Sequence, residues 1–321
     1  YSRVIDYMRL SVTDRCNLRC VYCTPLEGSK TDGSDADLTD GEIVRLVRIA
    51  ADLGIRRVRL TGGEPLVRPG LARLVEAIAS MGSIEDVSIT TNATLLAAQA
   101  RALADAGLRR VNVSLDSFQA GRYRSIRRRG HLEDVLEGIE RAREAGLSPI
   151  KINMVPIRGV NDDEIEDFAR FAMTSPYHVR FIELMPMGPL DFWSVERMVP
   201  TREVMERVGV VAELTPAIVP RSGPARHFRL GNSSGLVGFI SPMSHRFCDS
   251  CNRIRLTCRG NLRPCLFSEK ETPLAGPLRA GATDAELGRL FALSLAAKPA
   301  KHAVGSRSDV GHLKGMSKIG G

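Results

Sequence analysis

Short apolar runs typical of β-strands alternate with segments of helical spacing over the first half of the chain. Six runs predict strands, at 7–12, 57–61, 86–91, 110–116, 149–155 and 179–184. Between them, apolar residues recur every three or four positions and predict helices. The first helix opens with T-x-x-E, in which Thr39 and Glu42 form a capping box ahead of an apolar stripe from Ile43 to Leu53. Further helices are predicted at 71–79, 95–106 and 132–145, and one opens at Asn161. This alternation predicts a parallel sheet with helical crossovers.

Polar or glycine-rich motifs follow nearly every predicted strand. They are TDRC, TGGEP, TTN, SLDS and the end of the sixth strand at Glu183 to Met185. In a parallel barrel these strand ends ring one mouth, where active sites lie. The sequence therefore predicts an α/β fold, an open, partial (β/α)6 TIM-type barrel. A doubly wound sheet is the main alternative.

The pattern changes after about residue 186. The next fifty residues are rich in Pro, Gly and Arg, with a helix predicted at 202–208 and a strand at 236–241. A second capping box, at Thr283 and Glu286, opens another helix. These changes predict a barrel core over 1–186, a C-terminal domain over 187–298 and a flexible tail over 299–321 that ends in Gly-Gly.

The composition, 43% hydrophobic and 26% charged, is ordinary for a globular protein with a full core. The net charge of +8 fits either nucleic acid or a polyanionic small substrate such as a nucleoside triphosphate. Its arginines are spread along the chain, the dense run being 127–129, and aromatic residues are only 5%. We therefore expect no nucleic acid partner. No apolar run approaches the roughly 20 residues of a membrane span, so we expect no membrane contact.

The seven cysteines form two tight groups, Cys16, Cys20 and Cys23 and then Cys248, Cys251, Cys258 and Cys265. An odd number of clustered cysteines in a long chain without a signal-peptide pattern indicates metal binding in a reducing compartment. We expect a cytoplasmic location; a removed organellar targeting segment would leave no trace in the sequence.

The first group has the spacing C-x3-C-x2-C and no fourth ligand nearby. Three thiolates suit a [4Fe–4S] cluster whose fourth iron stays open to a substrate or cosubstrate. A zinc loop or free thiols are the alternative. In the second group, Cys248, Cys251 and Cys265 have the spacing C-x2-C-x13-C. A zinc knuckle completed by Cys258 or a histidine is a serious rival there.

The first cysteine loop, with Tyr22 before its last cysteine, and the motif TGGEP at 61–65 resemble the radical S-adenosylmethionine (radical SAM) enzymes. Further motifs extend the resemblance to one subfamily, the GTP 3′,8-cyclases of molybdenum cofactor biosynthesis. These motifs are RLSVTDRCNLRCVYC, RLTGGEPLVR, SITTN, RRVNVSLDS, KINMV, GVNDDE, RFIELMP, FCDSCNRIRLTCRGNLRPCLF and the terminal IGG. The resemblance covers the chain from about Val4 to Asp284 and returns at its last two glycines.

This resemblance implies a lyase that converts GTP to (8S)-3′,8-cyclo-7,8-dihydroguanosine 5′-triphosphate, the first step of molybdopterin synthesis. A 5′-deoxyadenosyl radical would abstract hydrogen from the ribose C3′, and the C3′ radical would attack guanine C8. Two [4Fe–4S] clusters and S-adenosylmethionine are the implied cofactors. The implied partners are GTP, an electron donor such as a flavodoxin or ferredoxin system, and cyclic pyranopterin monophosphate synthase, which receives the product. A homodimer is compatible with the family.

The resemblance also assigns roles to residues. Cys16, Cys20 and Cys23 would hold the cluster that binds S-adenosylmethionine, and Cys248, Cys251 and Cys265 the cluster that binds guanine. The positions implied to contact S-adenosylmethionine are Tyr22, Gly63, Ser114 and Met185. Those implied to contact GTP are Arg9, Arg59, Thr90, Lys151, Arg253, Ile254 and Arg255. The residues implied to take part in catalysis are Arg253, Arg255, Gly320 and Gly321.

Two residues depart from the family pattern. Ala93 stands where a glycine is usual after TTN, and Cys258 is an additional cysteine that we interpret as a free thiol. Two other functions compete with the cyclase. One is a peptide-modifying radical SAM enzyme with auxiliary clusters, although such enzymes usually carry more C-terminal cysteines. The other is a zinc-containing nucleic-acid binder, suggested by the charge and the C-x2-C spacing.

Overall fold

One curved sheet organises the protein. The computed structural model describes residues 3–23, 37–187, 189, 192–220, 223–302 and 316–319. Its strands are β1 (Tyr7–Ser11), β2 (Arg57–Thr61), β3 (Asp86–Thr91), β4 (Arg110–Ser114), β5 (Ile150–Met154), β6 (His178–Ile182), β7 (Leu214–Ala217), β8 (Arg226–Leu230), β9 (Leu236–Ile240), β10 (Arg253–Leu256), β11 (Asn261–Arg263) and β12 (Thr272–Pro273). Their order in the sheet is β12-β11-β10-β1-β2-β3-β4-β5-β6-β9-β8-β7.

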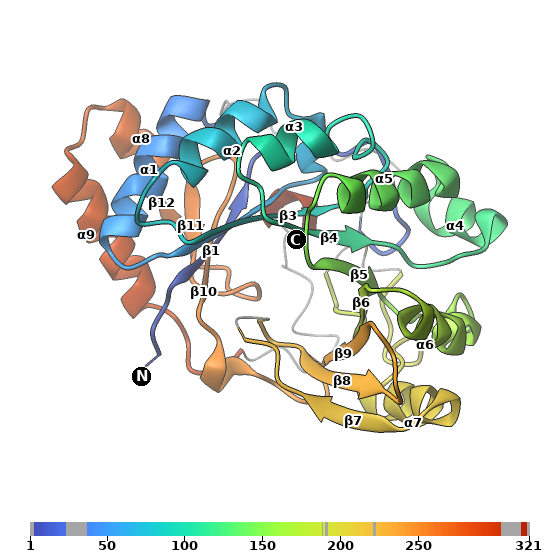
Figure 1. The fold of residues 1–321 in the computed structure, drawn as a ribbon. Helices are drawn as coiled ribbons and strands as arrows, with labels where there is room; N and C mark the ends of the chain where they lie inside the picture. The colour runs from blue at the N-terminus through green and yellow to red at the C-terminus, as the bar shows by residue number, and fades with distance from the viewer. Residues whose placement is uncertain are drawn as a thin grey trace.

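Most of the helices connect strands and lie on the convex side of the sheet (Figure 1). The α-helices are α1 (Asp40–Asp52), α2 (Leu71–Ala79), α3 (Ala100–Asp105), α4 (Ala120–Arg127), α5 (Leu132–Glu144), α6 (Ile165–Thr174), α7 (Thr201–Val211), α8 (Ala275–Arg279), α9 (Asp284–Ala296) and α10 (Met316–Ile319). Short 3₁₀ helices lie at η1 (Pro65–Val67), η2 (Asp162–Glu164) and η3 (Cys248–Ser250). None of the helices described is long and apolar enough to cross a membrane.

The six predicted parallel strands are confirmed as β1 to β6, but the parallel part of the sheet is larger than predicted. The C-terminal part of the chain adds β10 beside β1 and β9 beside β6, both in parallel register. The antiparallel strands β7, β8, β11 and β12 then extend the two edges. The parallel run is therefore eight strands wide. The segment that follows residue 187 completes the curved sheet at both edges (Figure 1).

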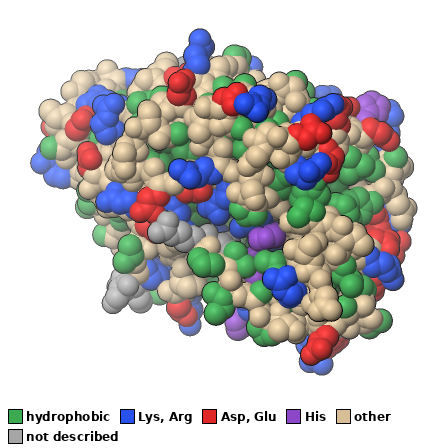
Figure 2. Space-filling view, in the orientation of Figure 1, with side chains coloured by type: hydrophobic (Ala, Val, Ile, Leu, Met, Phe, Trp, Pro, Cys, Tyr) green, Lys and Arg blue, Asp and Glu red, His purple; other side chains and the backbone are tan. Residues whose placement is uncertain are grey.

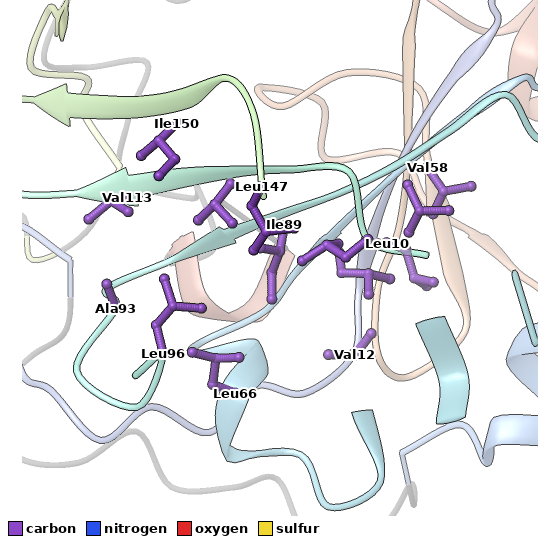
Figure 3. Close-up of a cluster of buried hydrophobic side chains, with 14 of the residues drawn as sticks. Leu10, Val12, Val58, Leu66, Ile89, Ala93, Leu96, Val113, Leu147 and Ile150 are labelled. Atoms are coloured by element: carbon purple, nitrogen blue, oxygen red, sulfur yellow. The ribbon is translucent and has the colours of Figure 1, made fainter. Parts of the chain in front are cut away.

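The two faces of the parallel strands differ in chemistry. Apolar side chains point toward the helices and form one core, as Leu10, Val58, Ile89, Val113 and Ile150 show for five adjacent strands (Figure 3). Side chains at the alternate positions point into the concave side, because successive side chains of a strand face opposite ways. Many of these are polar or charged. The sheet thus has an apolar convex face and a polar lumen.

The capping boxes predicted at Thr39 and Thr283 are both present and open α1 and α9. Three details of the prediction were wrong. Leu53 caps α1 and is 43% exposed, so it is not part of the buried stripe. Helix α3 begins at Ala100 rather than at 95, because turns occupy the preceding residues. Helix α4 was not predicted, since its charged sequence AGRYRSIR lacks a clear apolar stripe.

The turn after β3 lies against α5 at a glycine. Ala93 occupies the left-handed region, with φ 65°. A Cβ at Gly138 of α5 would lie 2.5 Å from the Ala93 carbonyl oxygen, closer than real Cβ atoms approach. The glycine therefore allows the helix to pack directly on this turn, whose neighbour Asn92 contacts the first cysteine loop.

We expect Gly138→Ala to lower the free energy of unfolding by about 1–3 kcal/mol, since the helix and the turn must separate. Gly121→Ala in α4 is the matched control, because a Cβ there meets nothing within 4 Å. It should raise the free energy of unfolding by about 0.5–1 kcal/mol through a less flexible unfolded chain. Chemical denaturation of both variants measures the two changes. Equal stability of the Gly138→Ala variant and the parent would show that the helix and the turn can move apart at little cost in free energy.

Candidate active site at the carboxyl ends of the strands

A cavity of about 320 Å³ lies at the mouth of the curved sheet, and both cysteine groups line it. The groups meet because β1 and β10 are parallel neighbours, with Arg9 opposite Arg255. The first group follows β1. In the second group, Cys251 precedes β10 and Cys265 follows β11. All six cysteines predicted as cluster ligands therefore face one space, although more than two hundred residues separate the groups.

The first cysteine loop is fixed on both sides by backbone and amide hydrogen bonds. Its Arg19 and Val21 amides donate to the carbonyls of Arg127 and Ile126, at 3.2 and 3.0 Å. On the other side, Asn17 donates to Thr94 Oγ1 at 2.8 Å and accepts a 2.9 Å bond from Asn92. The loop is thus held between the end of α4 and the turn after β3.

The TGGEP turn packs directly on the start of the cysteine loop. The Gly63 amide donates to Thr13 O at 2.8 Å, and a Cβ at Gly63 would lie 2.3 Å from Arg15 O. Only glycine fits so close an approach. Glu64 is 1% exposed and accepts bonds from Thr91 Oγ1 and from the Asn92 amide. Burial raises the pKa of Glu64 to about 7. Glu64 therefore ties TGGEP to the neighbouring strand end.

A buried ion pair lies beneath the first cysteine group. Arg127 Nη2 is 2.9 Å from Asp116 Oδ2, and these side chains are 4% and 2% exposed. Tyr22 donates to the same carboxylate oxygen at 2.6 Å, and Arg127 Nη1 donates to Cys20 Sγ at 3.2 Å. Arg127 thus connects the carboxylate after β4 to a cysteine of the loop.

The second cysteine group also has cations beside its sulfurs. Burial opposes ionisation of Cys251, but Arg253 and Lys298 outweigh it and lower the pKa of this thiol to about 7. Lys298 donates 2.7 Å bonds to the carbonyls of Arg253 and Pro264, next to Cys265. Arg3 donates to Cys248 O at 2.6 Å. These contacts hold the loop that carries the three cysteines.

The lumen collects buried cations. Burial and the neighbours Arg255 and Arg59 lower the pKa of Arg9 well below its ordinary value. Burial, followed by Arg253, lowers the pKa of Arg255 to about 9. Within the described residues, no carboxylate lies within ion-pairing distance of Arg9, Arg59 or Arg180. The buried atoms Arg9 Nε and Thr90 Oγ1 have no hydrogen-bond partner among the residues that the structure describes. An anionic ligand would offset this buried positive charge, because an unpaired buried charge is costly.

The outer surface has a different charge distribution from the lumen. On the face shown in Figure 2, Lys and Arg side chains are interspersed with Asp and Glu. Several exposed arginines of the protein form ion pairs with nearby acids, such as Arg101 with Asp105. The positive charge most in need of a partner is therefore inside the sheet.

Most of the predicted binding residues line the cavity. Those predicted for S-adenosylmethionine and found there are Tyr22, Gly63, Ser114 and Met185. Those predicted for GTP and found there are Arg9, Arg59, Thr90, Arg253 and Arg255. The side chain of Ile254 lies on the other face of β10, in the core. Lys151 is 1% exposed and lies deeper in the lumen, outside the cavity wall. Gly320 and Gly321 lie outside the described residues.

Several residues of the cavity were missed by the sequence reasoning. They are Asp116, Arg127, Asn153, Arg180, Lys298 and Met316. A signal existed for Arg180, since a basic residue inside the apolar strand HVRFI is unusual. Arg127 begins the dense run at 127–129. Lys298 carried no signal, because its role depends on two carbonyls that are distant in sequence.

Cys258 lies apart from the second group's cavity. It is 1% exposed, does not line the cavity, and sits with the carboxylates of Asp14 and Asp37, their ligand atoms within 4.8 Å of one another. Burial raises the pKa of Cys258 well above its ordinary value. Cys258 is therefore separate from the six predicted cluster ligands, and its role as a free thiol stays a prediction.

Replacing Arg127 by Met should leave the Asp116 carboxylate buried without its cation. We expect a loss of about 3–5 kcal/mol in the free energy of unfolding and less iron bound at the first cysteine group. Arg101→Met is the control, since the exposed Arg101–Asp105 pair should contribute less than about 1 kcal/mol. Denaturation and iron analysis measure both effects. A stable Arg127→Met variant with full iron content would contradict the role given to this pair.

Comparison with known proteins agrees with this geometry. Residues 10–172 match the radical SAM superfamily, and residues 177–304 match the family described as Molybdenum Cofactor Synthesis C. The chain is 48% identical to the GTP 3′,8-cyclase of Moorella thermoacetica over 322 residues, covering 100% of this chain and 99% of that protein. It is also 48% identical to the GTP 3′,8-cyclase of Pelotomaculum thermopropionicum over 331 residues, with the same coverage.

Solved structures share the fold. SuiB of Streptococcus suis, bound to its precursor peptide SuiA, aligns with a TM-score of 0.61 at 15% identity, covering 83% of this chain and 60% of that one. At this identity the likeness concerns the fold alone. The full-length identity to the cyclases is the stronger finding, and by it the chain belongs to the GTP 3′,8-cyclase family of the radical SAM superfamily.

Proposed function

We propose that this protein is a GTP 3′,8-cyclase, which converts GTP to (8S)-3′,8-cyclo-7,8-dihydroguanosine 5′-triphosphate in the first step of molybdenum cofactor biosynthesis. The observation that carries the proposal is that two three-cysteine groups and a set of buried arginines face one cavity. The cysteines suit metal clusters, and the arginines suit a polyanion. A nucleoside triphosphate beside two clusters uses both features.

The donor sets fit two [4Fe–4S] clusters. Cys16, Cys20 and Cys23 would hold one and Cys248, Cys251 and Cys265 the other, and each set leaves one iron without a thiolate. When bound, the clusters supply an electron for cleavage of S-adenosylmethionine and an open iron for substrate. Arg253 beside Cys251 favours the thiolate form that ligation needs, and Arg127 donates a hydrogen bond to Cys20 Sγ.

The remaining cavity residues bind and orient the substrates. Arg9, Arg59, Arg253 and Arg255 would neutralise the triphosphate, whose oxygens suit the fork of a guanidinium group. Tyr22, Gly63, Ser114 and Met185 would contact S-adenosylmethionine near the first group. Placing the two substrates between two fixed cysteine groups positions the ribose for reaction and keeps water away from it.

The described part of the C-terminal tail, residues 316–319, lies at the cavity. Met316 of α10 lines the cavity, and Ile319, the residue before Gly320, is 0% exposed. We infer that Gly320 and Gly321, the two residues that follow Ile319, take part in catalysis at this site. A glycine pair suits a narrow passage because it has no side chains.

The expected partners follow from this chemistry. A one-electron donor such as a flavodoxin or ferredoxin system would reduce the first cluster. The product would pass to cyclic pyranopterin monophosphate synthase. We expect the enzyme to work in the cytoplasm, where thiolates stay reduced, and a homodimer is compatible with this function.

Anaerobic reconstitution followed by incubation with GTP, S-adenosylmethionine and a reductant tests the proposal. The reconstituted protein should bind about eight irons, from two [4Fe–4S] clusters, and form 5′-deoxyadenosine only when GTP is present. Cys16→Ser should abolish this reaction, because a ligand of the open-iron cluster is lost. The buried Cys258→Ser variant is the matched control and should keep its iron and activity. One zinc without iron would refute the function, and loss of half the iron in the control would refute the ligand assignment.

A second prediction concerns the last two glycines. Gly320→Ala and Gly321→Ala should leave iron content and GTP binding nearly unchanged but stop formation of the cyclised product. A synthetic peptide that ends in Ile-Gly-Gly should restore part of the activity, because a high concentration offsets the lost tether. Quantifying 5′-deoxyadenosine and the cyclic product separates radical formation from cyclisation. Wild-type product formation after removal of both glycines would show that the tail has no catalytic part.

A further inference from the structure

A buried carboxylate lies where the neighbouring strands β6 and β9 end. Glu183 directly follows β6, is 3% exposed, and its amide donates to the carbonyl of Ile240, the last residue of β9, at 3.1 Å. Met185, two residues further on, lines the cavity, as do Ile240 and Pro242 on the β9 side. Glu183 itself is not among the cavity residues. The carboxylate is therefore buried next to two segments that form the cavity wall.

The Glu183 carboxylate accepts five hydrogen bonds from two other segments of the chain. Its Oε1 accepts from the Thr201 amide at 3.0 Å, from Thr201 Oγ1 at 2.8 Å and from Ser244 Oγ. Its Oε2 accepts from the amides of Met243 and Ser244, both at 3.0 Å. These donors are backbone amides and hydroxyls rather than a cation. Because a buried polar group is costly without such bonds, the carboxylate and the two segments stabilise one another.

One of these segments is the start of α7. Pro200, at the position before the helix, makes no capping bond with its side chain, so the amides of the first turn need another acceptor. Glu183 supplies this acceptor from β6 and places a negative charge at the positive end of the helix. Thr201 Oγ1 also shares a 2.7 Å bond with Ser241 Oγ. Glu183 thus caps α7 and joins its first residue to the chain that follows β9.

The other segment is the loop of residues 241–247, which runs from β9 to the second cysteine group. Pro242, near its start, and Phe247, at its end, line the cavity. The Phe247 ring centroid lies 5.0 Å from Cζ of Arg253, and Cys248 follows this ring directly in the sequence. A shift of the loop would therefore move a proposed GTP contact and a predicted cluster ligand together.

The sheet holds one side of this arrangement more firmly than the other. Met185 follows β6, which is paired with β5 on one side and with β9 on the other. The loop of residues 241–247 follows the end of β9. Two of its amides, those of Met243 and Ser244, donate to Glu183, whereas the His245 amide closes a turn within the loop. Weaker acceptors at residue 183 should therefore release the loop and leave the Met185 side in place.

We propose that Glu183 is a positioning residue that holds the loop of residues 241–247 against α7, and so fixes Arg253 and the second cysteine group relative to the S-adenosylmethionine contacts. This inference rests on the proposed function. A carboxylate suits the task because both of its oxygens accept, whereas a carboxamide turns an NH2 group toward one set of donors. The reaction requires the ribose to lie close to the adenosyl carbon, so a small displacement of the loop costs rate.

Glu183→Gln tests the proposal, because the side chain keeps its size but loses one acceptor. In the reconstituted enzyme we expect the KM for GTP to rise about tenfold, since groups that contact this substrate are misplaced. The KM for S-adenosylmethionine and the iron content should stay near the parent values. The ratio of 5′-deoxyadenosine to cyclised product should rise too, because radicals then form beside a misplaced ribose. Steady-state assays of both products measure these changes.

Two further variants separate positioning from a general loss of stability. Ser244→Ala removes one of the five donors and should raise the KM for GTP by a smaller factor. Thr283→Ala removes the cap of α9 instead, so it should lower the melting temperature and leave both KM values unchanged. An unchanged KM for GTP in Glu183→Gln, or an equal rise in both KM values, would overturn the proposal. If Glu183→Gln loses its iron, parent KM values in Ser244→Ala would overturn it.

Hydrogen exchange judges the positioning apart from the activity. In reconstituted Glu183→Gln, the amides of the loop of residues 241–247 and of Thr201 should exchange faster than in the parent, and those of α9 should not change. Equal exchange would overturn the inference. Failure of the proposed function looks different, because the unsubstituted protein would then form no GTP-dependent 5′-deoxyadenosine. The exchange comparison would decide the role of Glu183 in that case too.

Discussion

The structure depends on a sheet that presents hydrocarbon to one side and positive charge to the other. Leu10 and Arg9 are neighbours on β1, yet one lies in the core and the other in the lumen. Within the described part of the chain, Arg9 and Arg180 are buried without an ion-pairing carboxylate, which costs free energy, as their lowered pKa values show. The apolar face must supply the stability that allows this arrangement to persist before substrate arrives. Affinity for a polyanion is thus prepared by the fold itself.

Much of this organisation could be predicted from residues. The six strands, both capping boxes and the meeting of polar strand ends followed from periodicity and from motifs such as TGGEP. The edge strands could not be predicted in the same way, because β7, β10 and β11 are only three or four residues long. Short strands carry little periodic signal, and their place depends on the edge that receives them. The parallel pairing of β10 with β1, for example, depends on the tertiary structure and leaves no signal in the local sequence.

The residues of the site also divide into those that the sequence predicted and those that it did not. The six cysteines and most of the arginines could be named from motif resemblance, since their side chains carry the chemistry directly. Asp116 and Lys298 were missed because each acts through a partner far along the chain: Asp116 through Arg127, and Lys298 through two carbonyls. Ile254 belongs to a motif matched as a whole, yet its side chain faces the core. Motifs identify residues, whereas the direction of each side chain follows from the strand.

The order of strands in the sheet has a consequence for synthesis on the ribosome. Strands β1 to β6 emerge first, and their outer edges are β1 and β6. Both edges stay uncovered until β9 and β10, which come from the last third of the chain, have been made. Open parallel edges readily pair with other chains. The nascent protein must therefore pass through a stage that favours aggregation, and a chaperone that shields strand edges would increase the yield of folded enzyme.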